Sequence, residues 1–359
     1  MRKLVVWMLV GGIVVILLGL GALRVTAVQD GIAQRVVERR LSEQQQALFE
    51  PDALRALICG SASPLPHPSR AKACVAVFAA NRFWVVDTGT GSWNTLAMLG
   101  LDASRVGAIL LTHFHSDHIG DLGEFNLQTW AGGRDAPLTV YGPAGVERVV
   151  AGFNEAYALD AGYRTAHHGA ALMPPEASQM RAITIEGPQK SGVPAVVFKE
   201  DGLTITAFPV QHDPVVPAYG YRFDYKGRSL VVSGDTIKSA SLTAAARGVD
   251  VLIHEAQSDE MVDTIGRIAT RVGRSRIATI MKDIQNYHTT PVEAAEVANE
   301  AQAKLLVMYH LNPPPPARLV ERIFARGVDE VRDEGWILAD DGTLITLPAD
   351  SELVAVEQL

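Results

Sequence analysis

The stretch LLTHFHSDH, at residues 110–118, places three histidines and an aspartate directly after an apolar run. These residues are His113, His115, Asp117 and His118. So many imidazoles and carboxylates are costly to desolvate unless a cation binds them, and the mixture suits zinc and related transition metals. Residues two apart in an extended segment project to the same side. We therefore expect His113 and His115 to bind one ion, while Asp117 and His118, where a helix begins, face a second. The alternative is a polar loop with surface histidines.

Other segments of the chain also place a polar residue just after a strand-like apolar pattern. Three of them are Leu203–Val210 with His212, Ser229–Val232 with Asp235, and Leu305–Tyr309 with His310. Two more are Phe83–Val86 with Asp87 and Val249–Ile253 with His254. A single histidine after a strand is more often a capped or solvated residue. Several such residues, each just beyond a strand, predict side chains that converge on one rim of a sheet.

The motif H-x-H-x-D-H at residues 113–118 resembles the signature of the metallo-β-lactamase-fold hydrolases, and S-G-D-T at residues 233–236 resembles a later motif of that family. The resemblance implies the α/β class and a four-layer αββα sandwich with two metal ions at its open edge. It also implies a ligand set: His113, His115 and His212 for the first metal, Asp117, His118 and His310 for the second, and Asp235 as the bridge. Asp87, in D-T-G, resembles the family's early D-x-G element, whose aspartate orients ligands without binding metal.

Three segments resemble the ribonuclease Z branch of that family, which also contains arylsulfatase and cyclic-nucleotide phosphodiesterase relatives. They are G-Y-R at residues 220–222, H-E-A at 254–256 and Y-H-T-T at 287–290, within a resemblance that spans Leu54–Pro348. Two departures argue against tRNA maturation. Only residues 223–232 stand where ribonuclease Z carries a tRNA-gripping arm, and C-G-S-A at residues 59–62 replaces the branch's L-G-T-G.

The resemblance implies a dinuclear metal-dependent hydrolase of small phosphodiesters or sulfate esters, acting through a metal-bridging hydroxide. Zinc is the expected metal, and manganese or iron is compatible with the ligands. The expected catalytic residues are Asp117, His254, His288 and Glu255. Of these, His254 and His288 are candidates to protonate the leaving group, with Glu255 orienting one of them; the alternative is that all three are satisfied polar residues. Two other functions stay open: a lactonase or β-lactamase-type hydrolase of C–O or C–N bonds, and a non-catalytic, membrane-tethered metal-binding protein.

Length and composition predict one large catalytic domain, residues 53–359. The chain has 359 residues, 48% of them hydrophobic, and a formal net charge of −8. Lys and Arg form no dense cluster along the sequence, which disfavours long nucleic acids because these need a basic track. We therefore expect a small-molecule ester as substrate and no long nucleic acid as partner. A homodimer is left open.

The N-terminus has a different character. Leu4–Leu23 contains no charged residue, and about twenty apolar residues suffice to cross a bilayer. Residues 1–27 therefore predict a transmembrane signal anchor or a signal peptide, followed by a helical stalk over residues 28–52. The periodic part of that stalk is expected over Gly31–Phe49. We expect an inner-membrane anchor with the catalytic domain exported to the periplasm, or a secreted protein if the segment is cleaved.

Two further features bear on the exported domain. Cys59 and Cys74 flank a Pro-rich turn between two predicted strands. In an oxidising compartment they could form a disulfide, and two free buried thiols are the alternative. The run His167–Pro194 is dotted with Pro, Gly and Ser. We expect it to be irregular and regard it as a candidate substrate lid.

Overall fold

The computed structural model describes residues 24–42, 45–188 and 192–359. The chain divides into two units, Met1–Gln45 and Gln46–Leu359. In the first unit, helix α2 spans Thr26–Ser42. The predicted anchor Leu4–Leu23 lies outside the described residues. Among the residues that are described, no helix combines the length and hydropathy needed to span a membrane.

The predicted stalk helix Gly31–Phe49 differs from the structure at both ends. The α-helix begins earlier, at Thr26, and ends at Ser42. Residues Gln46–Phe49 instead form a short 3-10 helix, η1, that belongs to the second unit. The reason is apolar burial: Leu48 and Phe49 are buried, and the Phe49 ring contacts the ring of Phe78 edge-on at 5.5 Å.

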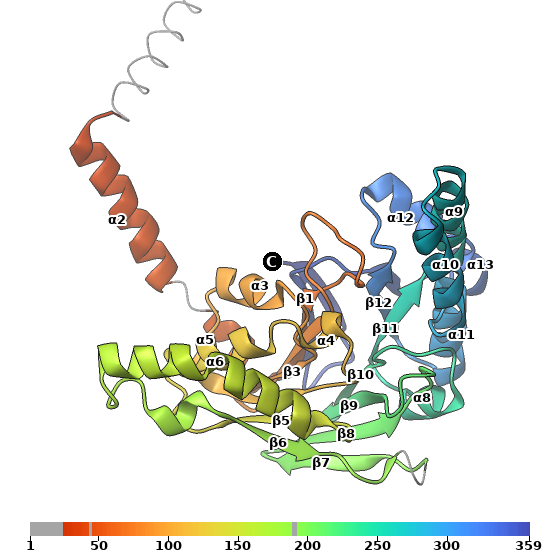
Figure 1. Cartoon of the computed structure of the whole chain (residues 1–359). Helices are drawn as coiled ribbons and strands as arrows, with labels where there is room; N and C mark the ends of the chain where they lie inside the picture. The colour runs from red at the N-terminus through yellow and green to blue at the C-terminus, as the bar shows by residue number, and fades with distance from the viewer. Residues whose placement is uncertain (1–23, 43–44, 189–191) are drawn as a thin grey trace, which may run out of the picture. The chain divides into compact units, whose positions relative to one another are not determined.

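The second unit is built on two β-sheets (Figure 1). The first sheet has the strand order β15-β14-β1-β2-β3-β4-β5-β6 and the second has the order β13-β12-β11-β10-β9-β8-β7. The strands of the first sheet are β1 Ala53–Gly60, β2 Cys74–Ala79, β3 Arg82–Val86, β4 Val106–Leu110, β5 Leu138–Gly142, β6 Met180–Thr184, β14 Thr343–Pro348 and β15 Ala355–Gln358. Those of the second are β7 Ala195–Glu200, β8 Leu203–Pro209, β9 Tyr219–Tyr225, β10 Arg228–Val232, β11 Val251–Gln257, β12 Leu305–Asn312 and β13 Trp336–Leu338.

Helices cover the outer face of each sheet. On the first sheet they are α3 Ser92–Met98, α4 Ser116–Ile119, α5 Leu122–Ala131 and α6 Val146–His168. On the second they are α8 Ala240–Ala245, α11 Pro291–Ala301, α12 Arg318–Phe324 and α13 Val328–Val331. The sequence T-P-V-E at residues 290–293 is typical of a helix start, and α11 begins there with a capping box between Thr290 and Glu293 and with Pro291 as its first residue.

Three large hydrophobic cores separate these layers. The central core joins inward side chains of both sheets, for example Ile58 and Leu110 with Tyr221 and Val307. A second core lies between the first sheet and its helices, and a third between the second sheet and its helices. Both faces of both sheets are thus covered, which explains why strands such as β1 are buried at every position. The predicted four-layer αββα sandwich is confirmed.

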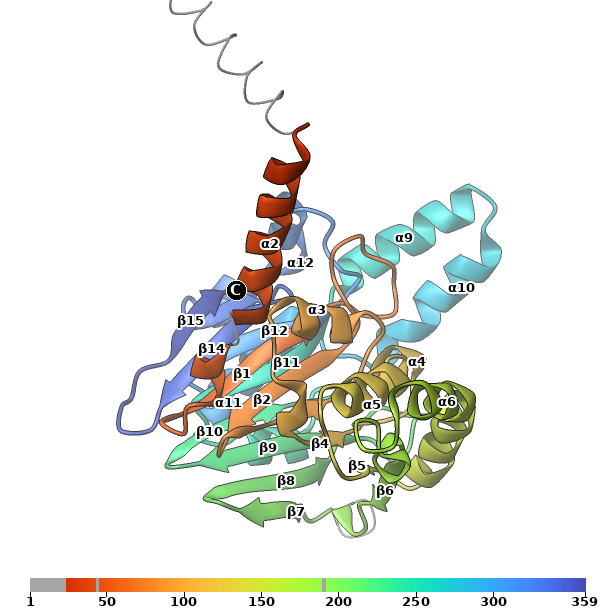
Figure 2. The same ribbon diagram turned by 90° about the vertical axis from the view of Figure 1, so that its left-hand side faces the viewer.

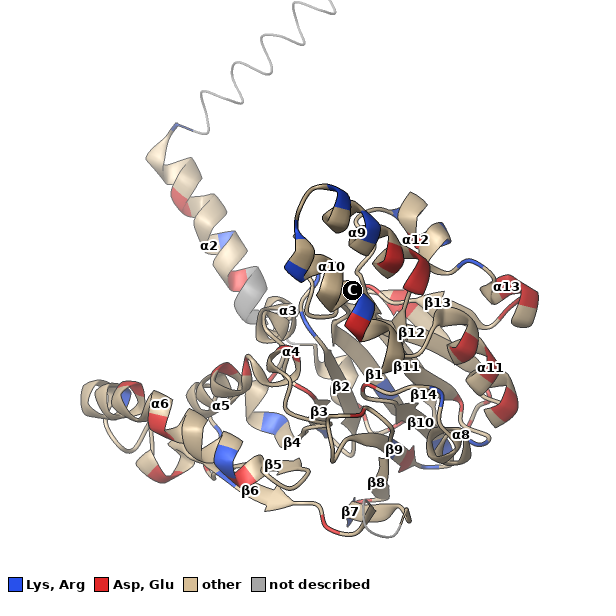
Figure 3. Ribbon diagram, turned by 45° about the vertical axis from the view of Figure 1, so that its right-hand side comes forward, with Lys and Arg blue, Asp and Glu red and all other residues tan. Residues whose placement is uncertain are grey.

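Helices α9 (Asp259–Arg271) and α10 (Ser275–Asp283) form a hairpin that projects from the sandwich (Figure 2). Its free end carries several Lys and Arg residues (Figure 3). The expectation that basic residues form no dense cluster was wrong, since Arg267, Arg271, Arg274 and Arg276 fall within ten residues. These residues are already close in sequence, and the hairpin places them around its free end.

The two cysteines are joined. Cys59 on β1 and Cys74 on β2 form a disulfide, with their Cα atoms 5.0 Å apart. In the antiparallel pairing of β1 with β2, Ile58 stands opposite Val75 and Gly60 opposite Cys74, so Cys59 is the extra residue of an irregularity beside Cys74. The structure thus decides between the two alternatives that the sequence left open.

The run His167–Pro194 is more regular than expected. His167 and His168 are the last two residues of helix α6, and Met180–Thr184 forms strand β6 at the edge of the first sheet. Parallel pairing with β5 orders this strand, which the local Pro and Gly content concealed. The expectation that this run is irregular was therefore wrong for the end of α6 and for β6, and its role as a substrate lid stays a prediction.

Candidate metal centre

The loop after β4 carries the first four predicted ligands. It stays extended through His113 and His115, and His115 is the N-terminal cap of helix α4. The two imidazoles converge, with His113 Nε2 only 2.9 Å from His115 Nδ1. Asp117 and His118 lie in the single turn of α4 and are buried. The change from extended chain to helix thus separates the four side chains into two pairs, as the spacing predicts.

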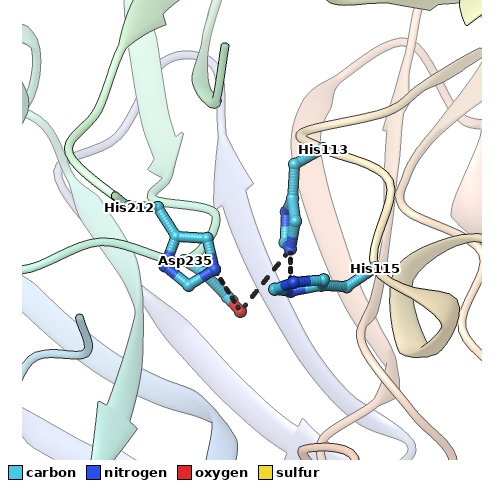
Figure 4. Close-up of side chains that lie close together, drawn as sticks. All are labelled: His113, His115, His212 and Asp235. Carbon is cyan, nitrogen blue, oxygen red and sulfur yellow. Dashed lines mark hydrogen bonds and ion pairs between the residues drawn. The ribbon is translucent and has the colours of Figure 1, made fainter. Parts of the chain in front are cut away.

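The later ligands come from the second sheet and meet the first four. His113, His115, His212 and Asp235 form one group whose ligand atoms all lie within 4.8 Å of one another (Figure 4), and Asp117, His118 and His310 form another. Asp235 lies between the groups: its Oδ2 is 3.8 Å from His113 Nε2 and from His212 Nε2, and 3.3 Å from His118 Nε2. Its other oxygen, Oδ1, is 3.5 Å from His310 Nδ1.

The side chains in this centre are suited to hold metal ions. Four buried atoms of the predicted ligands have no hydrogen-bond partner within the described part of the chain: His118 Nε2, His212 Nε2, Asp235 Oδ1 and His310 Nδ1. Buried polar atoms are almost always hydrogen-bonded, because leaving them without a partner costs free energy. Here they face one another across two groups of nitrogen and oxygen donors of the kind that zinc prefers. Two cations would satisfy all four atoms.

The protonation states of four of the ligands also fit this role, whereas burial of His118 is outweighed by Asp235, Asp87 and Asp117, which raise its pKa well above the usual value. Metal ligands must present a deprotonated atom. Burial lowers the pKa of His113, of His115 and of His212, so these imidazoles stay neutral. Burial alone would raise the pKa of Asp235, but the neighbouring His310 and His118 outweigh it and hold that pKa well below the usual value. The carboxylate is therefore charged.

His310 reaches the centre through a bulge in its strand. In the pairing of β11 with β12, Tyr309 stands opposite Glu255 and Leu311 opposite Ala256, so His310 is the extra residue. Its φ is 44°, a left-handed conformation that non-glycine residues seldom adopt. Bulges redirect a side chain, and strained backbone is commonly found at functional sites. His310 thus lies inside β12, and not just beyond its end as the sequence pattern suggested.

Asp87 orients His118, one of the two ligands on α4, without itself belonging to either ligand group. Its Oδ2 accepts a hydrogen bond from His118 Nδ1 at 2.8 Å, and the carboxylate also accepts from the Thr112 amide and hydroxyl, each at 2.8 Å. A carboxylate on Nδ1 fixes the proton there and leaves Nε2 free to bind metal. Asp87 also has a positive φ, 59°, where β3 turns toward this loop.

Glu255 and His288 form a second supporting pair. Glu255 Oε1 lies 3.1 Å from His288 Nδ1 and accepts the backbone N–H of Thr289 and of Thr236, at 3.0 and 3.2 Å. Burial disfavours the imidazolium form of His288, but the Glu255 carboxylate outweighs burial and raises the pKa to about 9. His288 also lies within ligand distance of Asp235 and His310. A protonated imidazole therefore stands at the edge of the metal centre.

Tyr287 is a site residue to which the sequence pattern gave no role. Its backbone carbonyl accepts a hydrogen bond from His212 Nδ1 at 2.9 Å, and its ring packs on the His212 ring at 4.8 Å between centroids. Both contacts leave His212 Nε2 facing Asp235. The only signal in the sequence was its place directly before His288 in the Y-H-T-T segment.

His254 is placed differently from its neighbour Glu255. It lies within β11, fully buried, and its Nδ1 bonds to the Glu255 carbonyl at 2.7 Å. It belongs to none of the His and Asp groups that could hold a metal in the described part of the chain. Adjacent residues of a strand point to opposite faces, so Glu255 reaches His288 while His254 turns away. This position favours a structural role for His254.

Comparisons with known proteins agree with this geometry. Residues 83–311 match the family model described as beta-lactamase superfamily domain. The chain is 36% identical over 263 residues, which is 72% of this chain and 86% of the relative, to a protein named ribonuclease Z from Mycobacterium bovis (strain BCG / Pasteur 1173P2).

Solved structures show the same fold. The metallo-beta-lactamase fold protein YhfI from Bacillus subtilis has a TM-score of 0.59 and 19% identity, covering 82% of this chain and 100% of that one. The short form of human tRNase Z has a TM-score of 0.57 and 21% identity, covering 82% of this chain and 99% of that one.

Proposed function

Because the chain belongs to the metallo-β-lactamase-fold hydrolases, in the branch that contains ribonuclease Z, we propose that it is a dinuclear metal-dependent phosphodiesterase. The observation that carries this proposal is the convergence of buried, unpartnered ligand atoms around Asp235. His113, His115 and His212 would hold one ion, Asp117, His118 and His310 the other, and Asp235 would contact both. Zinc fits the histidine-rich set best, and manganese or iron is compatible.

Two divalent ions supply Lewis-acid activation of a phosphoryl group and of the attacking water. The chain itself supplies orientation and a proton. Asp87 and the Tyr287 carbonyl fix the imidazoles of His118 and His212. His288, kept protonated by Glu255, is the residue that we propose donates a proton to the departing oxygen.

RNA is the first candidate substrate. The similarity to the ribonuclease Z of Mycobacterium bovis extends over 86% of that protein. The expectation that no nucleic acid is bound is therefore revised. Sulfate-ester hydrolysis, which the sequence left open, receives no support from the comparisons and is not proposed.

A small phosphodiester is the second candidate, on one specific observation. Strands β9 and β10 are joined by the two residues Lys226 and Gly227 alone, and Lys226 has a positive φ of 49° as expected of a tight hairpin. The chain therefore has no arm at the place where the resemblance implies a tRNA-gripping one.

The decisive experiment compares both substrate classes on the metal-loaded protein. An RNA with a 3′ extension and bis-p-nitrophenyl phosphate are each incubated with and without a chelator. We expect His113→Ala and Asp235→Ala to lose both bound metal and hydrolysis, whereas His168→Ala, an exposed histidine at the end of α6, leaves both unchanged. Absence of chelator-sensitive turnover on either substrate would contradict the proposal.

We also propose that the catalytic domain is exported. The uncharged segment Leu4–Leu23 and the Cys59–Cys74 disulfide support this, since disulfides persist mainly in oxidising compartments. In cells whose outer membrane is permeabilised and whose inner membrane is intact, added protease should cleave the catalytic domain. Protection until the inner membrane is lysed would place the domain in the cytoplasm instead.

A further inference from the structure

The α9–α10 hairpin is an amphipathic element whose apolar side is only partly covered. The two helices pack through small and buried residues: Gly266 lies against Met281, and Val262 and Ala269 are buried. Four aliphatic side chains remain exposed, namely Ile268 at 45%, Val272 at 63%, Ile277 at 39% and Ile280 at 45%. Contiguous exposed apolar patches mark interaction surfaces, and these four side chains fall within residues 268–280 of one hairpin.

These four side chains stay outside the groove between the two helices. That groove, about 230 Å³ in volume, is lined by residues that include Asp263, Arg267 and Lys282 and by none of the four. On a helix, residues four apart share a face, and so do residues three apart. Ile268 therefore lies beside Val272, the C-terminal cap of α9, and Ile277 lies beside Ile280 on α10.

Basic residues accompany the aliphatic ones. From Thr264 to Lys282 the chain contains four arginines and a lysine and no Asp or Glu, although the whole chain has a net charge of −8. Arg271 is three residues after Ile268, and Arg276 is four residues before Ile280, so each isoleucine has an arginine beside it on the helix surface. The ion pair of Arg267 with Asp263 neutralises one of these charges.

The hairpin is fixed at its base and free at its end. Arg326 pairs with Glu260 in the first turn of α9, and α10 runs through the 3-10 helix Ile284–Asn286 into Tyr287 and His288 of the metal centre. The turn between the helices, Val272–Arg274, is exposed throughout. Figure 2 shows this turn at the end farthest from the sheets.

We propose that the α9–α10 hairpin docks the catalytic domain on an anionic phospholipid bilayer. Aliphatic side chains flanked by arginines are the features with which helices lie in a bilayer interface, the first entering the acyl boundary and the second contacting anionic headgroups. A surface for single-stranded RNA would instead offer aromatic rings for base stacking, and residues 259–283 contain none. The inference goes beyond the proposed function and concerns where the catalytic domain works.

The test uses the full chain with one label. The native cysteines are joined to each other, so a cysteine introduced by Val272→Cys can be labelled alone with an environment-sensitive NBD fluorophore. The labelled protein is reconstituted in nanodiscs of phosphatidylcholine, with or without phosphatidylglycerol. We expect a blue shift and protection from iodide only in the anionic discs. The same label at Leu159→Cys, on α6 and 71% exposed, should stay water-exposed in both.

Two double variants test the arginines and the isoleucines of the hairpin separately. At about 1 kcal/mol per arginine near an anionic membrane, Arg271→Gln/Arg274→Gln should weaken the docking equilibrium roughly thirty-fold. Ile268→Ser/Ile280→Ser should also weaken it, although all the charges remain. A label at residue 272 that stays water-exposed in anionic discs overturns the proposal. A label that responds to added RNA but not to anionic lipid overturns it as well and assigns the hairpin to nucleic acid. None of these readouts requires hydrolysis, so the docking proposal and the phosphodiesterase proposal fail separately.

Discussion

Replacing Asp87 by Asn tests whether a residue that binds no metal sets the metal affinity of the centre. The Asp87 carboxylate accepts hydrogen bonds from His118 Nδ1 and from the Thr112 amide and hydroxyl, each at 2.8 Å. Asparagine keeps the size of the side chain and tolerates the positive φ of 59° better than most residues. It presents one acceptor and one NH₂ group, however, so either orientation of the amide sets two donors against each other.

The change that removes this contact between two donors at the lowest free-energy cost is a shift of the His118 proton from Nδ1 to Nε2. That atom faces Asp235 at 3.3 Å and Asp117 at 3.6 Å, and a protonated nitrogen cannot bind metal. Loss of such a supporting partner typically weakens metal binding 10- to 100-fold, which corresponds to about 1.4–2.7 kcal/mol. We expect this loss at the group of Asp117, His118 and His310, with the first group less affected.

Zinc titration against a competing chelator measures both affinities, and elemental analysis after dialysis measures the zinc retained. Far-UV circular dichroism checks that the fold is intact. Asp102→Asn is the matched control, because Asp102 caps the 3-10 helix Ala103–Arg105 just before β4, at the end of that strand opposite the metal centre. Zinc affinities of the Asp87 variant within twofold of the unchanged protein would refute the assigned role.

Three further outcomes are expected. The pKa of His288 is about 9, so its imidazolium is present as a proton donor below that pH and is lost above it. The kcat of the metal-saturated protein should therefore fall as pH rises through about 9. His288→Gln should lower kcat at neutral pH, while elemental analysis should find the metal still bound. A flat alkaline profile, or metal lost with the imidazole, would contradict that role. The double variant Cys59→Ala/Cys74→Ala removes a disulfide between residues 15 positions apart. Urea denaturation should show an unfolding free energy lower by about 3 kcal/mol. Equal unfolding free energies of the variant and the unchanged protein would show that the disulfide does not stabilise the fold. Arg228 is buried, pairs with Asp250 at 3.0 Å and donates a hydrogen bond to the carbonyl of Leu353. Arg228→Met should therefore lower the unfolding free energy by roughly 3–5 kcal/mol in the same urea measurement. A decrease under about 1 kcal/mol would mean that the pair is solvated.

The features that the sequence predicted are local ones. The H-x-H-x-D-H spacing separates two ligand pairs because an extended stretch changes to a helix at Ser116. The capping box of α11 depends only on Thr290, Pro291 and Glu293. Strands β8 and β10 begin within one residue of their predicted starts because their apolar patterns are short and bounded by turns. In each case the interactions that fix the conformation lie within a few residues of chain.

Only the tertiary structure decided the features that depend on strand register and distant pairing. Glu255 and His254 are adjacent, and the sequence predicted a catalytic role for both. The alternation of side chains along β11 directs Glu255 to His288 and directs His254 away from the metal centre. The Tyr287 carbonyl reaches His212 across 75 positions of chain, and a backbone group leaves no mark in composition. The arginines between residues 267 and 276 are close in sequence, but only the α9–α10 hairpin places them on an element that projects from the sandwich. Such contacts follow from how separate elements pack, and the order of residues within one element does not contain that information.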